Sequence, residues 1–243
     1  MPTLILTPRF TEDAQALWLA AGRLGWDVQR LTSWRIPDDI RSVPDPVLYL
    51  EGLVGPTLAE QFGLRLLVPP EDWLPGLPEE FRKRWIYSST LGQARSIAAP
   101  AFVKPPNDKS FPARVYASSE LPLDYEESTP VLVAEPVVWE KEFRCFVLNR
   151  QLRTLSVYLR DGEHQRANDF AQSSSEIAEA RVFVEAILTD SRVDLPRTAV
   201  IDVGVIASRG WAVVEQNAAW GSGIYGCDPE QVLEVIRFAT DPI

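Results

Sequence analysis

IDVGVIASRGWAVVEQN, residues 201–217, predicts two strands joined by a tight turn near the end of the chain. Side chains of a strand alternate between its two faces. This period of two sets four residues of the second strand on one face: Trp211, Val213, Glu215 and Asn217. Glu215 and Asn217 are therefore expected to point the same way.

A hairpin that turns between Ser208 and Arg209, close to the middle of this stretch, sets Asp202 opposite Glu215. A bulge at Gly210 would shift this pairing by one residue. Together with the amide of Asn217, three side chains with oxygen donors then converge. Hard cations such as Mg²⁺ prefer oxygen ligands and usually bind substrate phosphates as well as the protein. The alternative is a polar hairpin end with solvated carboxylates, and the pattern alone is too short to decide.

The composition of the 243 residues is that of a soluble globular protein, with 46% hydrophobic and 24% charged residues. The net charge of −10 disfavours a general nucleic-acid or anionic-membrane partner. Two cysteines, Cys145 and Cys227, make no disulfide framework, and the single His164 excludes a histidine-rich zinc site. We expect a cytoplasmic protein, because no signal-peptide pattern or membrane-spanning apolar run occurs.

The first 80 residues alternate short strands with helices. Strands are expected at 4–7, 27–31, 46–50 and 64–68, with a helix from the N-cap Thr11 to Gly25 and a shorter one ending at Gly63. This alternation predicts a small α/β domain with a parallel sheet. A proline-rich linker, PPEDWLPGLPEEFRKR, follows, and we expect Trp73 and Leu77 to pin it to the core.

The second part is richer in hairpins. Strands are expected at 101–104, 131–134, 142–148, 151–159 and in the 200–217 hairpin, with helices at 173–189 and 229–240. We therefore divide the chain into domains at 1–80 and 81–243.

Two lysines could neutralise polyphosphate oxygens. In FVKPPNDKSF, Lys104 ends a strand and Lys109 lies in the following loop. Lys104 directly follows apolar residues, so its stem is expected against the core with a functional head. For Lys109 alone, an ordinary surface lysine is the better interpretation.

The stretch EFRCFVL alternates, with Phe143, Cys145 and Val147 on a core face. Glu142 and Arg144 are expected side by side on the other face. They form either a structural ion pair or a binding site, in which Glu142 accepts hydrogen bonds from sugar hydroxyls and Arg144 binds phosphate oxygens.

In VLVAEPVVW the strand is interrupted at Glu135 and Pro136, where exposed backbone groups could recognise a planar base. The alternative is an edge strand with a bulge. The glycines of AAWGSGIYG allow close backbone approach to a ligand, and Trp220 and Tyr225 border an acceptor substrate or are structural.

Together these residues resemble the ATP-grasp superfamily in order and spacing over about residues 80–240. Lys104 matches the family's strand lysine, and Glu135 matches the glutamate of its hinge. Glu142 matches the glutamate that binds ribose. Asp202 matches the first acidic metal ligand, and Glu215 with Asn217 matches the Glu-x-Asn pair that completes the metal site. The details FVKPPNDKSF, EKEFRCFV and WGSGIYG are most similar to its R-two-K clade.

The resemblance implies an α/β N-terminal (pre-ATP-grasp) domain followed by an α+β ATP-grasp domain with antiparallel sheets. It implies a Mg-ATP-dependent ligase that joins a carboxylate to an amine through an acylphosphate, with small molecules or peptides as substrates. By this resemblance, Lys104 and Lys109 bind the phosphates of ATP, and Glu135 with the Val137 backbone binds adenine. Glu142 binds ribose. The Mg²⁺ ligands are Asp202, Glu215 and Asn217.

This sequence departs from the family pattern in two places. It lacks a glycine-rich phosphate loop after Lys104, and Val200 stands where many ligases of this type have an arginine. Arg144, with Lys109, is therefore our catalytic candidate. Two other functions stay open: an ATP-binding interaction module without ligation, and an ATP-dependent phosphotransferase. Homo-oligomerisation is also open, because eight tryptophans leave room for an apolar interface.

Overall fold

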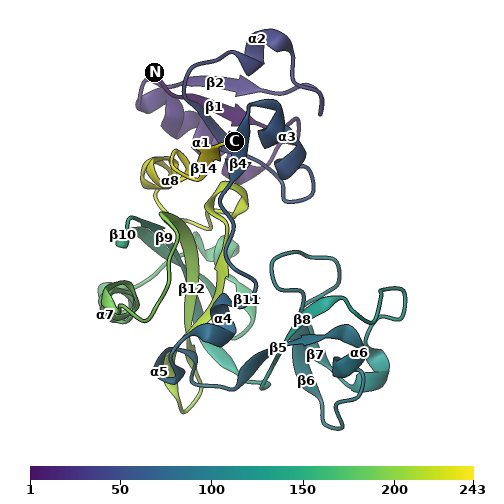
Figure 1. The fold of residues 1–243 in the computed structure, drawn as a ribbon. Helices are drawn as coiled ribbons and strands as arrows, with labels where there is room; N and C mark the ends of the chain where they lie inside the picture. Colours follow the sequence, from purple (N-terminus) through teal and green to yellow (C-terminus); the bar gives the residue numbers. More distant parts are fainter.

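A three-stranded parallel sheet, in the order β2-β1-β3, forms the N-terminal part of the computed structural model, which describes residues 1–243 (Figure 1). Its strands are β1 (Thr3–Leu6), β2 (Asp27–Arg30) and β3 (Pro46–Tyr49), and its helices are α1 (Glu12–Arg23), α2 (Asp38–Arg41) and α3 (Gly55–Gln61). The expected N-cap of α1 is confirmed, since the Thr11 side chain accepts a hydrogen bond from the Ala14 backbone N–H.

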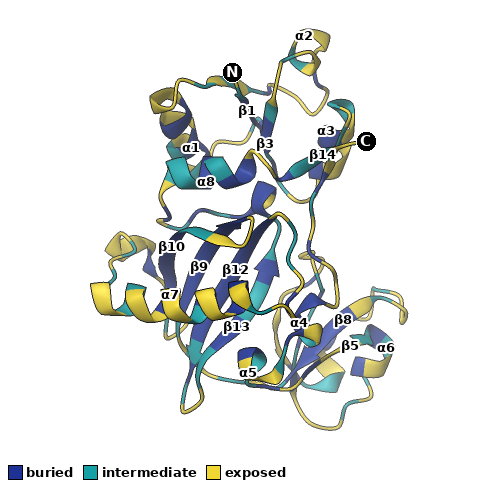
Figure 2. Cartoon of the chain, turned by 60° about the vertical axis from the view of Figure 1, so that its left-hand side comes forward, coloured by how far each residue is buried: buried dark blue, intermediate teal, exposed yellow.

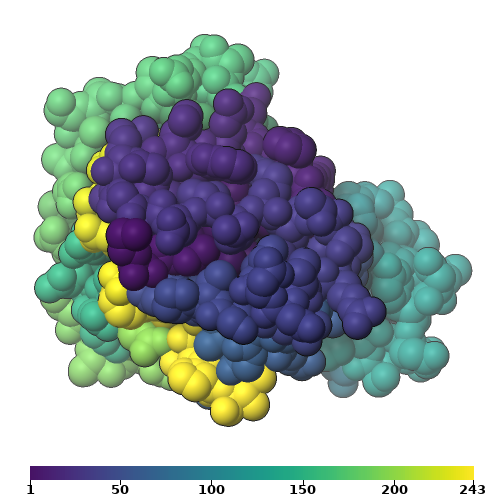
Figure 3. All heavy atoms as spheres, turned by 90° about the horizontal axis from the view of Figure 1, so that it is seen from above, coloured from purple at the N-terminus to yellow at the C-terminus, as the bar shows by residue number.

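The fourth N-terminal strand, β4 (Leu64–Leu66), does not join the parallel sheet as expected. It pairs antiparallel with β14 (Thr240–Pro242) at the end of the chain. The C-terminus returns here because α8 (Pro229–Ile236) packs against α1, and Figure 3 shows the yellow C-terminal residues beside the purple and blue N-terminal ones at the surface. Because β4 and β14 are far apart along the chain, no local sequence pattern around β4 indicates that the two strands pair.

One apolar core joins the N-terminal strands, α1 and α8. It also takes in Phe146, Leu148 and Val200 from the larger sheet described below. This core therefore crosses the division that we draw at residue 80. None of the helices combines the length and the apolar character that a membrane span requires.

The larger sheet has five antiparallel strands in the order β11-β10-β9-β12-β13. Its strands are β9 (Trp139–Leu148), β10 (Gln151–Arg160), β11 (Glu163–His164), β12 (Thr198–Ile206) and β13 (Gly210–Asn217). The helix α7 (Ser174–Thr189) covers one face of this sheet and exposes its outer side to solvent (Figure 2). The expected alternation of β9 is confirmed, because Phe143, Cys145 and Val147 are fully buried in the core that also contains the buried face of α7.

The smaller sheet has four antiparallel strands in the order β5-β8-β6-β7. Its elements are β5 (Ile86–Thr90), α6 (Leu91–Ala94), β6 (Ala101–Lys104), β7 (Arg114–Tyr116) and β8 (Pro130–Ala134). Two short helices, α4 (Trp73–Gly76) and α5 (Glu79–Arg82), lie in the linker. Trp73 and Leu77 are buried, which confirms that they pin this linker to the core. Short 3-10 helices cover Ser118–Glu120, Gln165–Asn168 and Ala219–Gly221.

The hairpin of β12 and β13 pairs Asp202 with Glu215, as the sequence predicts. The expectation that Val213 shares a face with Glu215 is wrong. Val203 pairs with Val213, so Val214 is an extra residue, a bulge that shifts the alternation by one position. Val213 therefore packs in the core under α7, whereas Glu215 faces the other side with Asp202.

Gly204 of β12 lies where a side chain does not fit. A Cβ there would lie 2.7 Å from the Lys141 carbonyl oxygen and 2.8 Å from the Trp139 ring. We expect Gly204→Ala to lower the free energy of unfolding by about 1–3 kcal/mol, because strand backbone must shift. Urea unfolding would measure this, with Gly52→Ala, where a Cβ meets open space, as control. Equal effects of the two changes would contradict the prediction.

Candidate active site

Three oxygen-bearing side chains of the β12–β13 hairpin lie together on the face of the larger sheet away from α7. Asn217 Nδ2 donates hydrogen bonds to Asp202 Oδ2 at 3.2 Å and to Glu215 Oε1 at 3.0 Å. Asp202 and Glu215 are cross-strand partners, which holds their carboxylates on one side. The three proposed metal residues are therefore brought together.

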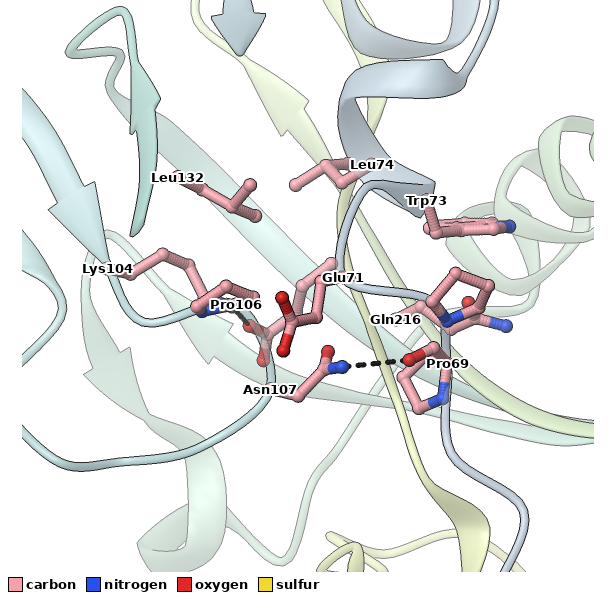
Figure 4. Close-up of a pocket in the computed structure, with 11 residues that line it drawn as sticks. Pro69, Glu71, Trp73, Leu74, Lys104, Pro106, Asn107, Leu132 and Gln216 are labelled. Carbon is pink, nitrogen blue, oxygen red and sulfur yellow. Dashed lines mark hydrogen bonds and ion pairs between the residues drawn. The ribbon is translucent and has the colours of Figure 1, made fainter. Parts of the chain in front are cut away.

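Lys104 reaches this group from the smaller sheet. Its Nζ donates to Glu215 Oε2, and both side chains are largely buried, 14% and 29% exposed (Figure 4). Burial by itself would raise the pKa of Glu215, but the Lys104 ammonium and the bond from Asn217 outweigh burial and lower the pKa to about 2. This ion pair joins the two sheets across the site.

Arg144 on β9 is bound to Asp202 through two parallel hydrogen bonds. Its Nε and Nη2 donate to Asp202 Oδ1 at 3.0 Å and Oδ2 at 2.6 Å, because the two residues are cross-strand partners on neighbouring strands. Asp202 is fully buried, and Arg144 is 6% exposed. Burial opposes the charge of the guanidinium, but the paired carboxylate outweighs burial and raises the pKa of Arg144, which stays charged. Burial raises the pKa of the Asp202 carboxyl, and the Arg144 guanidinium opposes this rise.

Arg144 also holds the loop that follows Asn217. Its Nη1 donates to the Gly223 carbonyl at 2.9 Å, and its guanidinium lies 4.4 Å from the ring centre of Tyr225. Tyr225 stacks on Tyr158 and has a φ of 45°, the left-handed conformation that non-glycine residues seldom adopt. Arg144 is therefore a connection between the metal candidates and this loop.

Glu142 is buried on the same face of β9, and its Oε2 accepts a hydrogen bond from the Tyr158 hydroxyl at 2.7 Å. Burial raises the pKa of Glu142 to about 7, the bond from Tyr158 lowers it, and the nearby charges of Asp202 and Glu215 raise it further. The proposed ribose ligand thus lies beside the proposed metal site.

The raised pKa of Glu142 predicts a pH-dependent stability. Since the folded-state pKa of about 7 exceeds the ordinary 4.5, the folded protein binds more protons between these values, and stability falls as pH rises through this window. Urea unfolding of wild type and Glu142→Gln at pH 5 and pH 8 would measure it. We expect wild type to lose up to about 3 kcal/mol relative to the variant. A difference that does not change with pH would contradict this.

The remaining predicted residues lie apart from this group. Glu135 receives two hydrogen bonds from Arg209, at 2.6 and 2.9 Å, where the connection between β8 and β9 meets the hairpin tip. The bonds from Arg209 lower the pKa of Glu135. Val137 is half-buried in the same connection, and Lys109 is exposed and makes no ion pair. Nothing in the local sequence indicates that Arg209 holds Glu135, because the two residues are distant along the chain.

A cleft adjoins the Lys104–Glu215 pair between the smaller sheet, the linker and β13. Its walls include Glu71, Asn107 and Gln216, while Val137 and Glu142 do not line it (Figure 4). Asn107 Nδ2 donates to the Pro69 carbonyl at 2.8 Å and so ties the loop after Lys104 to the linker. The sequence did not point to Gln216, because the alternation of β13 places it on the face opposite Glu215.

Comparison with known proteins places the chain in a family. The model of the ATP-grasp domain of the R-two-K clade, family 2, matches residues 81–235, more than half of the chain. The chain belongs to this ATP-grasp family. No curated protein matches the sequence.

Solved structures share the ATP-grasp fold over nearly the whole chain. D-alanine–D-alanine ligase from Bacillus anthracis is 14% identical, with a TM-score of 0.57 and coverage of 98% of this chain and 96% of that chain. A RimK domain ATP-grasp protein from Sphaerobacter thermophilus is 13% identical, with a TM-score of 0.53 and coverage of 97% and 99%. L-amino acid ligase from Bacillus licheniformis is 15% identical, with a TM-score of 0.59 and coverage of 98% and 74%. These identities show the fold alone.

ATP-grasp membership implies Mg²⁺, and the donor set of the chain fits this ion. No group of three or more His, Cys, Asp or Glu residues forms a metal cluster. The hairpin supplies two carboxylates and one amide. Mg²⁺ typically binds one or two carboxylates together with substrate phosphates, so a sparse set of oxygen donors beside a phosphate site is suitable.

Proposed function

We propose that this ATP-grasp chain is a Mg-ATP-dependent ligase that joins a carboxylate to an amine. The γ-phosphoryl group moves to the carboxylate and ADP leaves. The amine then attacks the acyl carbon, forming an amide as inorganic phosphate leaves and the amine gives up a proton. The observation that carries the proposal is the convergence of Lys104 from the smaller sheet with Asp202, Glu215 and Asn217 from the larger one.

Lys104 is proposed to leave Glu215 for the phosphate oxygens of ATP, which offer a higher negative charge than one carboxylate. Glu215 and Asn217 would hold Mg²⁺, with Asp202 behind them. When bound, the ion would neutralise charge on the phosphates. We propose that Glu142 accepts from ribose hydroxyls and that the Val137 backbone meets adenine.

Arg144 was our catalytic candidate from the sequence, and we now propose a different role for it. It is bound to Asp202 and Gly223, so we propose that it positions Asp202 and the loop at 218–226. Lys109, exposed in the loop after Lys104, stays a proposed phosphate ligand. We also propose residues 1–80 as the pre-ATP-grasp domain and 81–243 as the ATP-grasp domain. The start of the family match at residue 81 supports the second.

The same observation about Arg144 favours a second candidate, a nucleotide-controlled interaction module. Its guanidinium is already bound on both sides, and Val200 supplies no arginine in its place.

ADP release with ATP, Mg²⁺ and pooled carboxylates and amines would separate these functions. A ligase turns over repeatedly only when both substrates are present, releasing ADP and incorporating the amine. ATP binding without turnover on any pool would support the module, and a stable phosphorylated product without amine would indicate a phosphotransferase.

A further inference from the structure

One arginine of the linker binds the bulge of β13. Val214 is the extra residue of this strand, and it stands between Val213 in the core and Glu215 on the opposite face. Arg84 Nη1 donates to the Val213 carbonyl at 2.7 Å, and its Nη2 donates to the Val214 carbonyl at 3.1 Å. Nη1 also donates to the carbonyl of Arg82 at 3.0 Å. A single guanidinium therefore ties the linker to the bulge.

The position of Arg84 matches the irregular backbone of this strand. In a regular strand, successive carbonyl groups point to opposite edges, so one guanidinium does not reach two in a row. A bulge disturbs this alternation. β13 is also the last strand of the larger sheet, and the linker helices α4 and α5 lie beside it (Figure 2). At the bulge, Arg84 therefore supplies the donors that a neighbouring strand would supply elsewhere.

Arg84 is a buried cation that is held by backbone oxygens. Its side chain is 8% exposed, and all of its hydrogen bonds go to carbonyl groups. Burial lowers the pKa of Arg84 to about 10, and the charges of Glu142 and Glu135 oppose this shift, so the guanidinium is charged at neutral pH. Because hydrogen bonds from a charged donor are stronger than neutral ones, Arg84 and the bulge geometry stabilise each other.

The bulge decides which face of the sheet receives the end of β13. Without it, the pairing that precedes the bulge would continue in step and would set Glu215 opposite Ile201 and Asn217 opposite Ala199. Ile201 and Ala199 are buried in the core under α7. Since cross-strand partners lie on the same face, a slip of one residue would turn both side chains away from Asp202.

We propose that Arg84 is a positioning residue, which fixes the bulge through two carbonyls and so keeps Glu215 and Asn217 on the face of Asp202. Arg84 acts through the backbone of β13 and needs no contact with ATP for this role. The consequence for Mg²⁺ rests on the proposed function. The position of the strand does not, because it can be measured in the protein without nucleotide.

Hydrogen–deuterium exchange of the ligand-free protein at the backbone amides of residues 210–217 tests this role. Arg84→Met keeps the apolar stem and removes the donors, and we expect these amides to exchange about 10–100-fold faster. Arg84→Lys keeps the charge without the planar fork and should give an intermediate rate, which also serves if Arg84→Met does not fold. Arg82→Met is the matched control, because the Arg82 guanidinium donates to the Ile86 carbonyl and to no group of β13. Unchanged exchange in both Arg84 variants would overturn the inference.

Deletion of Val214 separates positioning from a merely structural role. The deletion makes the pairing on both sides of the bulge continuous, so that Glu215 faces Asp202 by ordinary alternation and Arg84 is no longer needed. We expect Arg84→Met alone to weaken Mg-ATP binding about tenfold, and the same change combined with the deletion to bind within about threefold of wild type. Calorimetry would measure both.

A combined variant that binds Mg-ATP more weakly than either single variant would overturn the inference. Lost packing, or a lost contact between Arg84 and ATP, would add to the effect of the deletion and would not be rescued by it. Faster exchange in β13 together with unchanged Mg-ATP binding in every variant would retain the positioning role and would reject Glu215 and Asn217 as magnesium ligands.

Discussion

Arg144→Leu is expected to lower the free energy of unfolding by about 3–5 kcal/mol. The change leaves the fully buried carboxylate of Asp202 without the guanidinium that binds both of its oxygens. A buried charge that loses its partner keeps the whole cost of desolvation. Urea unfolding followed by circular dichroism would measure the loss.

The double variant Arg144→Leu/Asp202→Leu is the informative partner of this experiment. Because it removes both charges, we expect it to recover much of the lost stability. Arg192→Leu is the surface control. Arg192 is 59% exposed and pairs with Glu80 and Asp190, and such pairs are worth about 0–1 kcal/mol. Similar losses for Arg144→Leu and Arg192→Leu would contradict a buried, energetically important pair.

Lys104→Met is expected to weaken Mg-ATP binding about 10–100-fold, the range for losing a charge-assisted hydrogen bond to phosphate. Methionine keeps the apolar stem against the core and removes the ammonium. Calorimetry with Mg-ATP would measure the change. Lys141→Met is the matched control, because Lys141 pairs with Glu176 at the start of α7 and lies away from the site.

Glu215→Ala tests the other half of the same ion pair. We expect weaker Mg-ATP binding here as well, since the variant loses a proposed magnesium ligand although it frees Lys104. Equal affinity in wild type and Glu215→Ala would argue strongly against a nucleotide site at this hairpin.

Local patterns predicted the parts of this site that lie within single elements or hairpins. The pairing of Asp202 with Glu215 follows from the position of the turn, and the core face of β9 follows from its alternation. Family membership was also readable, because it depends on the order and spacing of a few residues along the chain.

Contacts between distant segments could not be predicted in this way. The bulge at Val214 follows from how β13 fits β12, and it reverses the face assigned to Val213. The pairing of Glu135 with Arg209 and that of β4 with β14 join residues that the sequence separates widely. The pairing of Arg144 with Asp202 could not be predicted either, since it depends on β9 lying next to β12 in the sheet.

By itself, therefore, the sequence determined which side chains are candidates for the chemistry, because the period of two and the turn residues act over a few positions. The tertiary structure decided which of these side chains are free. It bound Arg144 to a buried carboxylate and set Lys104 against Glu215. The physical reason is that burial and pairing arise only when separate sheets pack, and the cost of a buried charge or amide depends on those neighbours.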